Sequence, residues 1–506
     1  MNKSSGKQLP AVLRTDVYDV PVGQDINTDL LYPVNISQQG AKFVFPRKGV
    51  LDSNSQINIS QTCNQIAGDE TKCYLPTSTG ALAMVRRAWL TIGGRRVSTL
   101  DQVGHYNTWK RLHFSNEYRE GVAMPKQGGN DVFVGSTGKD IVAVGAVDAT
   151  SVKQRGFLAN APNTGAGNGV LGRIGTEYSK DPATGLQRNT ADKTTDSSDL
   201  ITSNAATTPN YAIGLSQLIP FLVGVQLPLF AIAEEVALNV EWATSEFGHR
   251  FCVPQAQLAN QNNIFSTIVE NDVYIMADYM FFPAQMETLQ EEIMEKGGFD
   301  IPYDEIQVQE TTTAVLTQGS ITTEIQLPLG GKVLKSVVVQ QEITDGADEG
   351  LVNVGRYNSM ALRQGQSVNL TIESRPFYAN SISNPSLQLS EANAIESGIP
   401  LQLCMYKYSW DNQVNAFGVV DKAGITDRTF NGHISLIEMG SQFWTGVKLE
   451  NMSGRGIRMS NLPAIFTRRA TLDATNPDIG KQHRLRFFCK TARMLNISGG
   501  IVNMIE

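Results

Sequence analysis

The stretch LIPFLVGVQLPLFAIAEEVALNVEW, residues Leu218–Trp242, decides the fold. It opens with the longest apolar run in the chain, which Pro220 and Pro228 interrupt. Its last part, Val236–Trp242, places large apolar residues on one face and Ala, Asn and Glu on the other. Alternation with a period of two predicts a strand with one face in a core.

The apolar run cannot continue as one long helix. A proline at position 228 would remove a backbone donor and clash with the preceding turn. We therefore predict a strand, a short helix or turn around Gly224–Ala233, and then a second strand. Together these pieces indicate a buried corner of a β-sandwich.

Length and composition suggest two domains rich in turns. The chain has 506 residues, and single cores stop growing near about 250–300 residues. Hydrophobic residues make up 41% and charged residues 18%, the balance of an ordinary globular protein. The 45 glycines and 20 prolines favour short strands joined by turns over long helices.

The charge argues against a protein that coats nucleic acid. The formal net charge is −7, whereas such a protein needs a basic face. Arginine pairs stand at Arg86-Arg87, Arg95-Arg96 and Arg468-Arg469, and we interpret each as a solvated strand edge or a salt bridge to a neighbour. Direct sequence-specific binding to nucleic acid is not expected.

The cysteines and the N-terminus fit a protein made inside a cell. Five scattered cysteines without a Cys-x-x-Cys motif do not form a disulfide framework. The first twelve residues contain no apolar core of a secretory signal. No stretch of 18 residues is apolar enough to predict a transmembrane helix.

The second informative stretch is Ala81–Leu112. Val85, Trp89 and Thr91 predict a strand, and Gly93-Gly94 predicts a hairpin turn because glycine adopts positive φ without a steric penalty. The strand resumes at Arg95–Thr99. Asp101–Leu112 then has a weakly helical pattern with an acidic residue near its start.

A long polar excursion, residues 128–210, follows. It is rich in Gly, Ser, Thr, Asn, Asp and Ala and poor in large apolar residues. Ordinary connections are far shorter, so we interpret it as a long surface loop of the first domain, with a short strand at Ile141–Val147.

The boundary between the domains is predicted near residue 290. Asp272–Phe282 has the composition of a final core strand. Met286–Lys296 is helical in composition and ends at Gly297-Gly298, a typical C-terminal stop.

The second half repeats the strand pattern. The predicted strands lie at Ile321–Leu329, Val333–Ile343, Val368–Ile372, Leu401–Ser409, Gly432–Met439 and Arg484–Ile497. Strands separated by turns, with no helices between them, predict an antiparallel sandwich. Two such halves predict two jelly rolls in tandem.

The sequence offers no persuasive catalytic or metal-binding arrangement. Gly167–Gly172 matches G-x-G-x-x-G but has no strand before it and no helix after it, so a dinucleotide site is not expected. His249 and Cys252 lack a second pair of metal ligands. Asp345–Glu349 lacks the spacing of a calcium loop. We therefore predict no catalytic, cofactor-binding or metal-binding residue, and no enzyme.

Several of these stretches resemble the double jelly-roll major capsid proteins of tailless icosahedral double-stranded DNA viruses. The likeness is to the eukaryotic branch, which comprises nucleocytoplasmic large DNA viruses, virophages and polinton-like viruses. The residues that carry it are Ile92-Gly93-Gly94, Asp101, Trp109, Leu227-Pro228-Leu229, Asp278-Tyr279, Ile321–Gln341, Ala492-Arg493, Asn496 and Gly499-Gly500. Their order spans most of the chain.

The resemblance implies two eight-stranded antiparallel jelly rolls side by side, in an all-β fold with a short linker helix. The implied segments are an N-terminal arm (1–27), a first jelly roll (28–285), a linker helix (286–300) and a second jelly roll (301–506). The excursion at 128–210 would be the outward loop between the third and fourth strands (D and E) of the first roll.

The function implied by the resemblance is that of a major capsid protein, which forms pseudo-hexameric trimers that tile the shell of a virion. The implied partners are other copies of the chain and minor capsid and penton proteins, with an inner membrane as a possible contact of the N-terminal arm. A carbohydrate- or receptor-binding sandwich on the virion surface is the alternative. A jelly-roll enzyme such as a cupin is a third reading, and five scattered histidines argue against it.

Overall fold

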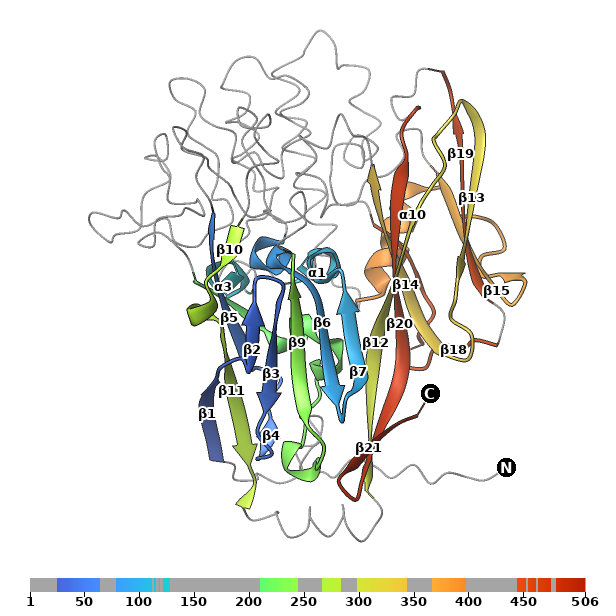
Figure 1. Cartoon of the computed structure of the whole chain (residues 1–506). Coiled ribbons are helices and arrows are strands. Elements are labelled where there is room, and N and C mark those ends of the chain that lie inside the picture. Colours follow the sequence, from blue (N-terminus) through green and yellow to red (C-terminus); the bar gives the residue numbers. More distant parts are fainter. Residues whose placement is uncertain are drawn as a thin grey trace, which may run out of the picture.

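A computed structural model of the chain describes residues 25–63, 79–111, 113–114, 118, 122–127, 210–243, 266–283, 298–343, 366–396, 444–451, 454–460, 463–474 and 479–505. These residues form four antiparallel sheets in two sandwiches that stand side by side with their strands upright (Figure 1). We call residues 25–283 roll 1 and residues 298–505 roll 2. None of the helices in the described part is long and apolar enough to cross a membrane.

Roll 1 consists of eight main strands in two sheets. One sheet has the order β1-β11-β5-β8 and the other β3-β9-β6-β7. In chain order the strands are β1 (Asp25–Leu31), β3 (Gly40–Phe45), β5 (Gln56–Cys63), β6 (Val85–Ile92), β7 (Arg95–Asp101), β8 (Asn210–Gly214), β9 (Val236–Trp242) and β11 (Tyr274–Phe281). Numbered from one to eight, they pair as 1-8-3-6 and 2-7-4-5. Short strands extend the edges: β2 (Asn35–Ser37), β4 (Val50–Leu51) and β10 (Ser266–Ile268).

Roll 2 has the same connectivity. Its sheets are β12-β20-β14-β17 and β13-β19-β15-β16, which again read 1-8-3-6 and 2-7-4-5. In chain order the strands are β12 (Phe299–Thr312), β13 (Gly319–Leu327), β14 (Val333–Ile343), β15 (Ser367–Ile372), β16 (Arg375–Pro376), β17 (Thr445–Lys448), β19 (Ala464–Leu472) and β20 (His483–Ser498). Two short strands, β18 (Ile457–Arg458) and β21 (Ile501–Ile505), join the first sheet. The prediction of tandem eight-stranded jelly rolls is confirmed.

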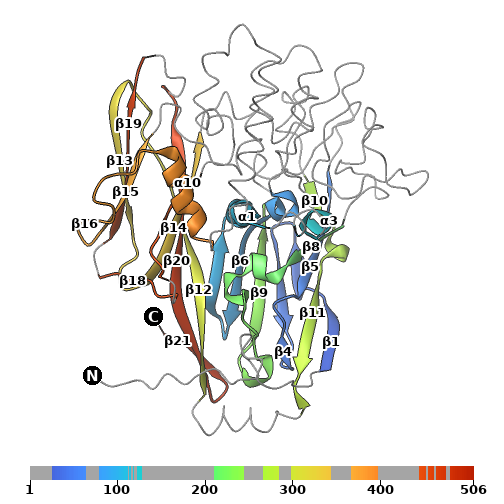
Figure 2. The ribbon, with the colours of Figure 1, turned by 180° about the vertical axis from the view of Figure 1, so that it is seen from behind.

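Each roll carries a helix after its fifth strand. In roll 1 this is α1 (Val103–Arg111), and in roll 2 it is α10 (Pro385–Ala394). Figure 2 shows both from behind. The helix α10 interrupts a half that the sequence predicted to lack helices. The sequence did not indicate this helix because its apolar residues do not gather on one face of PSLQLSEANA.

The stretch that decides the fold is partly a strand and partly a series of helical turns. Val236–Trp242 is β9, as its alternation predicted. The apolar run before it is not a strand. It forms α6 (Leu215–Leu218) and the 3₁₀ turns η6 (Pro220–Leu222) and η7 (Leu229–Ala231). The reason is local, because Pro220 occupies the first position of a turn, where its missing N–H costs nothing.

The second informative stretch behaves as predicted. The strands β6 and β7 form a hairpin, and Gly93 and Gly94 turn it with φ of 57° and 76°. A 3₁₀ turn, η2 (Gly80–Met84), leads into it, and α1 follows it. The remaining short elements of roll 1 are α3 (Met124–Gln127) and η9 (Glu270–Asp272).

The excursion at 128–210 has a different place from the one the resemblance implied. Its start follows α3 and its end leads into β8, so it joins the fifth and sixth strands of roll 1 and not the third and fourth. The strands β5 and β6, which the excursion was expected to connect, are joined by residues 64–84 instead. The sequence alone could not show this, because the place of the excursion depends on how many strands of the sandwich precede it.

Several other predicted features lie outside the described residues. They are the strands at Ile141–Val147, Leu401–Ser409 and Gly432–Met439, and the linker helix at Met286–Lys296. The first described strand pairing begins at Asp25, opposite Phe281, and roll 2 begins with β12 at Phe299.

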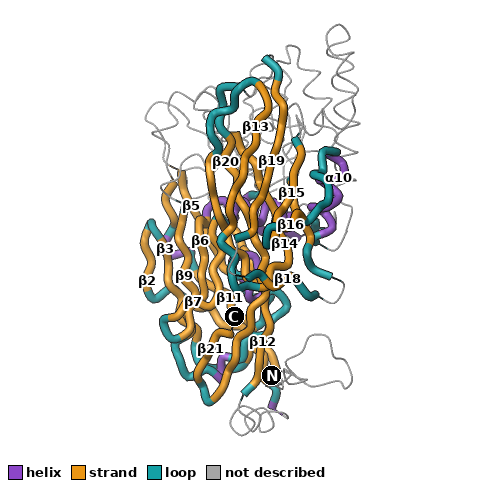
Figure 3. Tube along the Cα trace, turned by 90° about the vertical axis from the view of Figure 1, so that its right-hand side faces the viewer, coloured by secondary structure: helices purple, strands orange, loops and turns teal. Residues whose placement is uncertain are grey.

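The core of roll 1 continues into the junction with roll 2. A single cluster of buried apolar side chains includes residues of both rolls, whereas a second cluster fills roll 2 alone. Strand β14 shows why: Val337 and Val339 point into roll 2, and Val338 between them belongs to the shared cluster. A strand buried on both faces reads as an unbroken apolar run. Figure 3 views the molecule from the side of roll 2, whose strands run upright.

Candidate functional site: the junction and the exposed sheet faces

Aromatic side chains close the upper part of the junction between the rolls. Tyr106 and Trp109 of α1 meet Phe488 of β20 and Trp444, with ring centroids 5.5 Å apart for Tyr106–Phe488 and 5.4 Å for Trp109–Trp444. Burial is the main reason that the pKa of Tyr106 lies well above its usual value, so its hydroxyl is neutral. Tilted aromatic pairs of this kind contribute about 0.5–1.5 kcal/mol beyond the area they bury.

An ion pair ties α1 to the segment after α10. Lys110 Nζ lies 2.5 Å from Glu396 Oε2. Burial by itself would raise the pKa of Glu396, but Lys110, Lys490 and His113 outweigh it and the pKa is lowered. Next to this pair, His113 packs edge-on against Trp109, and burial lowers its pKa to about 4.

In the middle of the junction, a hydrogen bond links strands of the two rolls. The Tyr303 hydroxyl of β12 donates to the Val97 carbonyl of β7 over 2.9 Å. Phe221 of η6 packs edge-on against the Tyr303 ring at 4.8 Å. The apolar turns that the sequence misassigned therefore support the junction.

Backbone hydrogen bonds hold the lower end of the junction. The Ala233 N–H donates to the Gly500 carbonyl over 2.8 Å, and the Val502 N–H donates to Glu234 over 3.1 Å. Arg95 donates to the Val502 carbonyl over 2.5 Å and to Glu234 over 3.2 Å. The tip of roll 2 is thus fixed to the β6–β7 hairpin and to η7 of roll 1.

A cavity of about 500 Å³ lies in the junction between α1, η6 and the sheet of roll 2. Lys335 and Lys490 line it and both pair with Asp304, at 2.6 Å and 3.2 Å. Its apolar lining includes Val223 and Ile306. Four cations line the cavity (Lys110, Lys335, Lys490 and Arg493), together with one carboxylate, Asp304. The other carboxylates that pair with these cations, Glu396, Glu450 and Glu305, do not line it.

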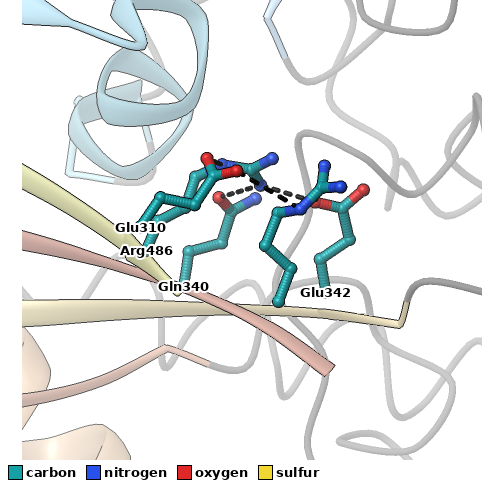
Figure 4. A network of polar contacts seen from close by, with 5 residues as sticks. Glu310, Gln340, Glu342 and Arg486 are labelled. Atoms are coloured by element: carbon teal, nitrogen blue, oxygen red, sulfur yellow. Dashed lines mark hydrogen bonds and ion pairs between the residues drawn. The ribbon is translucent and has the colours of Figure 1, made fainter. Parts of the chain in front are cut away.

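Above the junction, a charged network crosses three strands of roll 2 (Figure 4). Arg486 of β20 donates to Glu310 of β12 over 2.7 Å and to Glu342 of β14 over 2.5 Å. It also donates to Gln340 over 3.1 Å. Arg486 is 1% exposed, and its pKa is raised because the two carboxylates outweigh the cost of burial.

The arginine pairs singled out in the sequence serve the structure. Arg87 pairs with Asp101, and Arg86 lies 3.2 Å from Glu241. Arg96 stacks on the Trp89 ring. Salt bridges to neighbours are confirmed for the first two pairs. In the third pair only Arg469 is exposed, whereas Arg468 is buried and donates to Gln341 over 2.9 Å.

The sequence motifs considered for catalysis or metal binding lie outside the described residues: Gly167–Gly172, His249, Cys252 and Asp345–Glu349. In the ranges that the structure describes, no group of three or more His, Cys, Asp or Glu side chains is placed to hold a metal ion.

Large apolar side chains are exposed on both rolls. On the outer face of β1 and β11 they are Ile26, Leu30 and Met276, continued by Tyr32. On the side of roll 2 they are Phe377, just after β16, and Leu387 of α10. Exposed apolar groups that gather on one face mark a contact surface. Sequence reasoning missed both sets because it does not show which face of a strand stays uncovered.

Comparison with solved structures identifies the architecture. The chain matches VP54 of PBCV-1, fitted into a reconstruction of the virophage Sputnik, with a TM-score of 0.53 and 12% identity over 97% of this chain and 98% of that chain. The fold is the double jelly roll. The 3.5 Å structure of the Sputnik virophage matches with a TM-score of 0.52 and 11% identity over 97% and 90% of the two chains.

A quasi-atomic model of the PBCV-1 capsid matches with a TM-score of 0.51 and 12% identity over 97% and 98% of the two chains. No protein-family model matches the sequence, and no curated protein matches it. At such low identity the double jelly-roll likeness establishes the fold and not the activity.

Proposed function

We propose that this chain is a major capsid protein that assembles as trimers with a pseudo-hexagonal outline, and that these trimers tile an icosahedral virion shell. One observation carries the proposal: in the described residues, two jelly rolls of identical connectivity stand side by side and share a cluster of buried apolar side chains. Two equivalent blocks in each of three subunits make a six-sided unit, which suits a lattice of hexagonal neighbours.

The site geometry supports a structural role. Hydrogen bonds and ion pairs such as Tyr303–Val97 and Lys110–Glu396 link the two rolls within the chain. Exposed apolar residues remain on both rolls, where contacts between subunits could cover them. We propose that the chain acts by burying surface between copies and that it is not an enzyme. Stable interfaces of this kind bury more than about 2,000 Å².

The proposal also covers the binding partners of the chain and its location. Copies of the chain are its main partner, and minor capsid and penton proteins fill the places where trimers do not pack alone. The N-terminal arm, 1–27, is proposed to contact an inner membrane or a neighbouring trimer. The protein would be made in the host cell and reside in the capsid.

The test is the state of the purified full-length chain. Mass photometry should show a species of three times 55.2 kDa, about 166 kDa, and negative-stain images should show particles with a hexagonal outline. A chain that stays at 55 kDa at high concentration contradicts the proposal. Binding of the monomer to a glycan array would favour the alternative of a receptor-binding sandwich.

A further inference from the structure

We infer that the cavity in the junction between the two rolls binds a small amphipathic anion, that is, a carboxylate or phosphate group carried on an apolar body. The cavity has a volume of about 500 Å³, which lies in the range of sites that bind small organic molecules. All of its walls belong to one chain, so the inference does not depend on the proposed trimer.

One wall of the cavity is cationic and belongs to roll 2. Lys335 of β14 and Lys490 of β20 come from neighbouring strands, and their side chains are 14% and 26% exposed. Asp304 of β12 contacts both ammonium groups, at 2.6 Å and 3.2 Å. Burial by itself would lower the pKa of Lys490, but Asp304 and Glu396 outweigh it and the pKa is raised. Lys490 is therefore a cation at neutral pH.

The lysines of the cavity have more hydrogen-bond donors than protein acceptors. An ammonium group has three N–H donors. Among the described residues, Lys490 and Lys110 each contact one carboxylate, at 3.2 Å and 2.5 Å, and Lys335 contacts two. The other donors can bind the oxygen atoms of a ligand, and hydrogen bonds between charged groups are about twice as strong as neutral ones.

Most of the carboxylates that balance these cations lie outside the cavity. Of the four that pair with its cations, only Asp304 lines it, whereas Glu305, Glu396 and Glu450 do not. An anion in the cavity is therefore closer to the cations than to three of the four acids. Because Coulomb attraction falls with distance, the cavity favours a negatively charged ligand.

The other wall is largely apolar and belongs to roll 1. It includes Val223 and Val225, which follow η6, and the rings of Phe114 and Tyr118, which pack edge-on at 4.9 Å. Val223 is 60% exposed, so contact with an apolar ligand would remove its surface from water. Figure 2 shows elements of both walls, with α1 beside β12 and β20. An inorganic anion would leave this wall uncovered, and a neutral apolar molecule would leave the ammonium groups without an acceptor.

The first experiment separates the charged head from the apolar body with four probes. Octanoate and octyl phosphate carry both, octanol carries only the body, and inorganic phosphate carries only the head. Saturation-transfer NMR on the full-length chain should show saturable binding of octanoate or octyl phosphate with a dissociation constant below about 1 mM. The tighter of the two identifies the head group. Octanol and inorganic phosphate should bind at least about 10-fold more weakly, because each leaves one wall without a partner.

The second experiment assigns the binding to the cationic wall. Lys490→Met removes one cation while Lys335 stays paired with Asp304, and it should weaken binding of the tighter anion by at least about 10-fold. Lys42→Met is the matched control, because Lys42 is an exposed lysine that pairs with Glu235 and does not line the cavity. This control should leave the affinity unchanged.

The third experiment changes the charge of the apolar wall without disturbing a buried group. Val223→Glu should bind the anion at least about 3-fold more weakly than Val223→Lys, because the two variants differ in the sign of one charge beside the ligand. Val315→Glu is the control, since Val315 is 49% exposed and does not line the cavity. Circular dichroism verifies that each variant is folded.

Three results overturn the inference. The first is that neither anion binds saturably up to about 5 mM. The second is that octanol or inorganic phosphate binds as tightly as the anions, and the third is that folded Lys490→Met binds them as tightly as the wild type. A blocked pentaglutamate peptide that binds about 10-fold more tightly than either anion would assign the cavity to an acidic segment of a partner protein, which also overturns it.

Discussion

Arg486 is a buried cation that three strands of roll 2 hold in common. Its guanidinium donates to Glu310, Glu342 and Gln340. Glu342 and Gln340 are buried, whereas the Glu310 side chain is 35% exposed. The network is important to the fold even if a well-packed apolar cluster in its place would stabilise the protein as much. Loss of Arg486 leaves the buried carboxylate of Glu342 with Arg484, 4.0 Å away, as its remaining counter-charge.

Arg486→Met should therefore lower the free energy of unfolding by about 3–5 kcal/mol. Lys42→Met is the matched control, because Lys42 and Glu235 form an ion pair whose side chains are 41% and 55% exposed. That exposed pair contributes less than about 1 kcal/mol. Denaturant titration of both variants measures the difference, and equal effects would contradict the role given to Arg486.

His113 makes the stability of the junction depend on pH. Its folded pKa is about 4 because it is buried, below the ordinary value of 6.5. The unfolded chain therefore binds a proton at higher pH than the folded one, and stability falls as pH drops from 6.5 to 4. The loss is on the order of 3 kcal/mol for the full shift.

His113→Phe keeps the edge-on contact with Trp109 and removes the titration. We expect this variant to lose less stability than the wild type between pH 7 and pH 4.5. Unfolding curves at the two pH values test it. If the stability of the wild type and that of the variant depend on pH in the same way, titrating groups other than His113 cause the dependence.

The β6–β7 hairpin joins the rolls through its turn. Gly93 and Gly94 both have positive φ, yet their surroundings differ. A Cβ at Gly93 would lie 2.3 Å from Glu234 Oε1, whereas a Cβ at Gly94 would meet no atom within 4 Å. Glu234 is the carboxylate that Arg95 and Val502 share at the lower end of the junction.

Gly94→Ala should cost about 1–2 kcal/mol, the price of a left-handed backbone for an L-residue. Gly93→Ala should cost about 1 kcal/mol more, because Glu234 must move and loses its hydrogen bonds to the tip of roll 2. Thermal denaturation of the pair measures this. If the two variants are equally destabilised, Glu234 moves aside without losing its hydrogen bonds.

At the scale of the whole molecule, the two rolls share a hydrophobic core. One cluster of buried side chains runs from roll 1 through Trp444 to Phe488 and Ile497. Separating the two rolls would expose these residues to solvent. The two rolls therefore depend on each other in a way that separate domains with small interfaces do not.

The chain should unfold in one cooperative transition, with equal calorimetric and van't Hoff enthalpies. Phe488→Ala should lower the free energy of unfolding by about 3–5 kcal/mol and keep the transition single. Differential scanning calorimetry tests both statements. Two resolved peaks in the wild type would show that the rolls fold independently.

The sequence by itself determined the local elements and the class of fold. The alternation at Val236–Trp242, the glycines at 93 and 94 and the run Val333–Ile343 are local signals, and each became the predicted element. Strand periodicity and turn chemistry depend on near neighbours in the chain, so they can be read before folding.

Only the tertiary structure decided the order of the strands in the sheets and the place of the excursion between β7 and β8. It also decided which apolar faces are covered, since Phe488 is buried while Leu30 is exposed although both lie on outer sheet faces. The reason is that burial of a strand face depends on what packs against it, and those partners lie far away in the sequence.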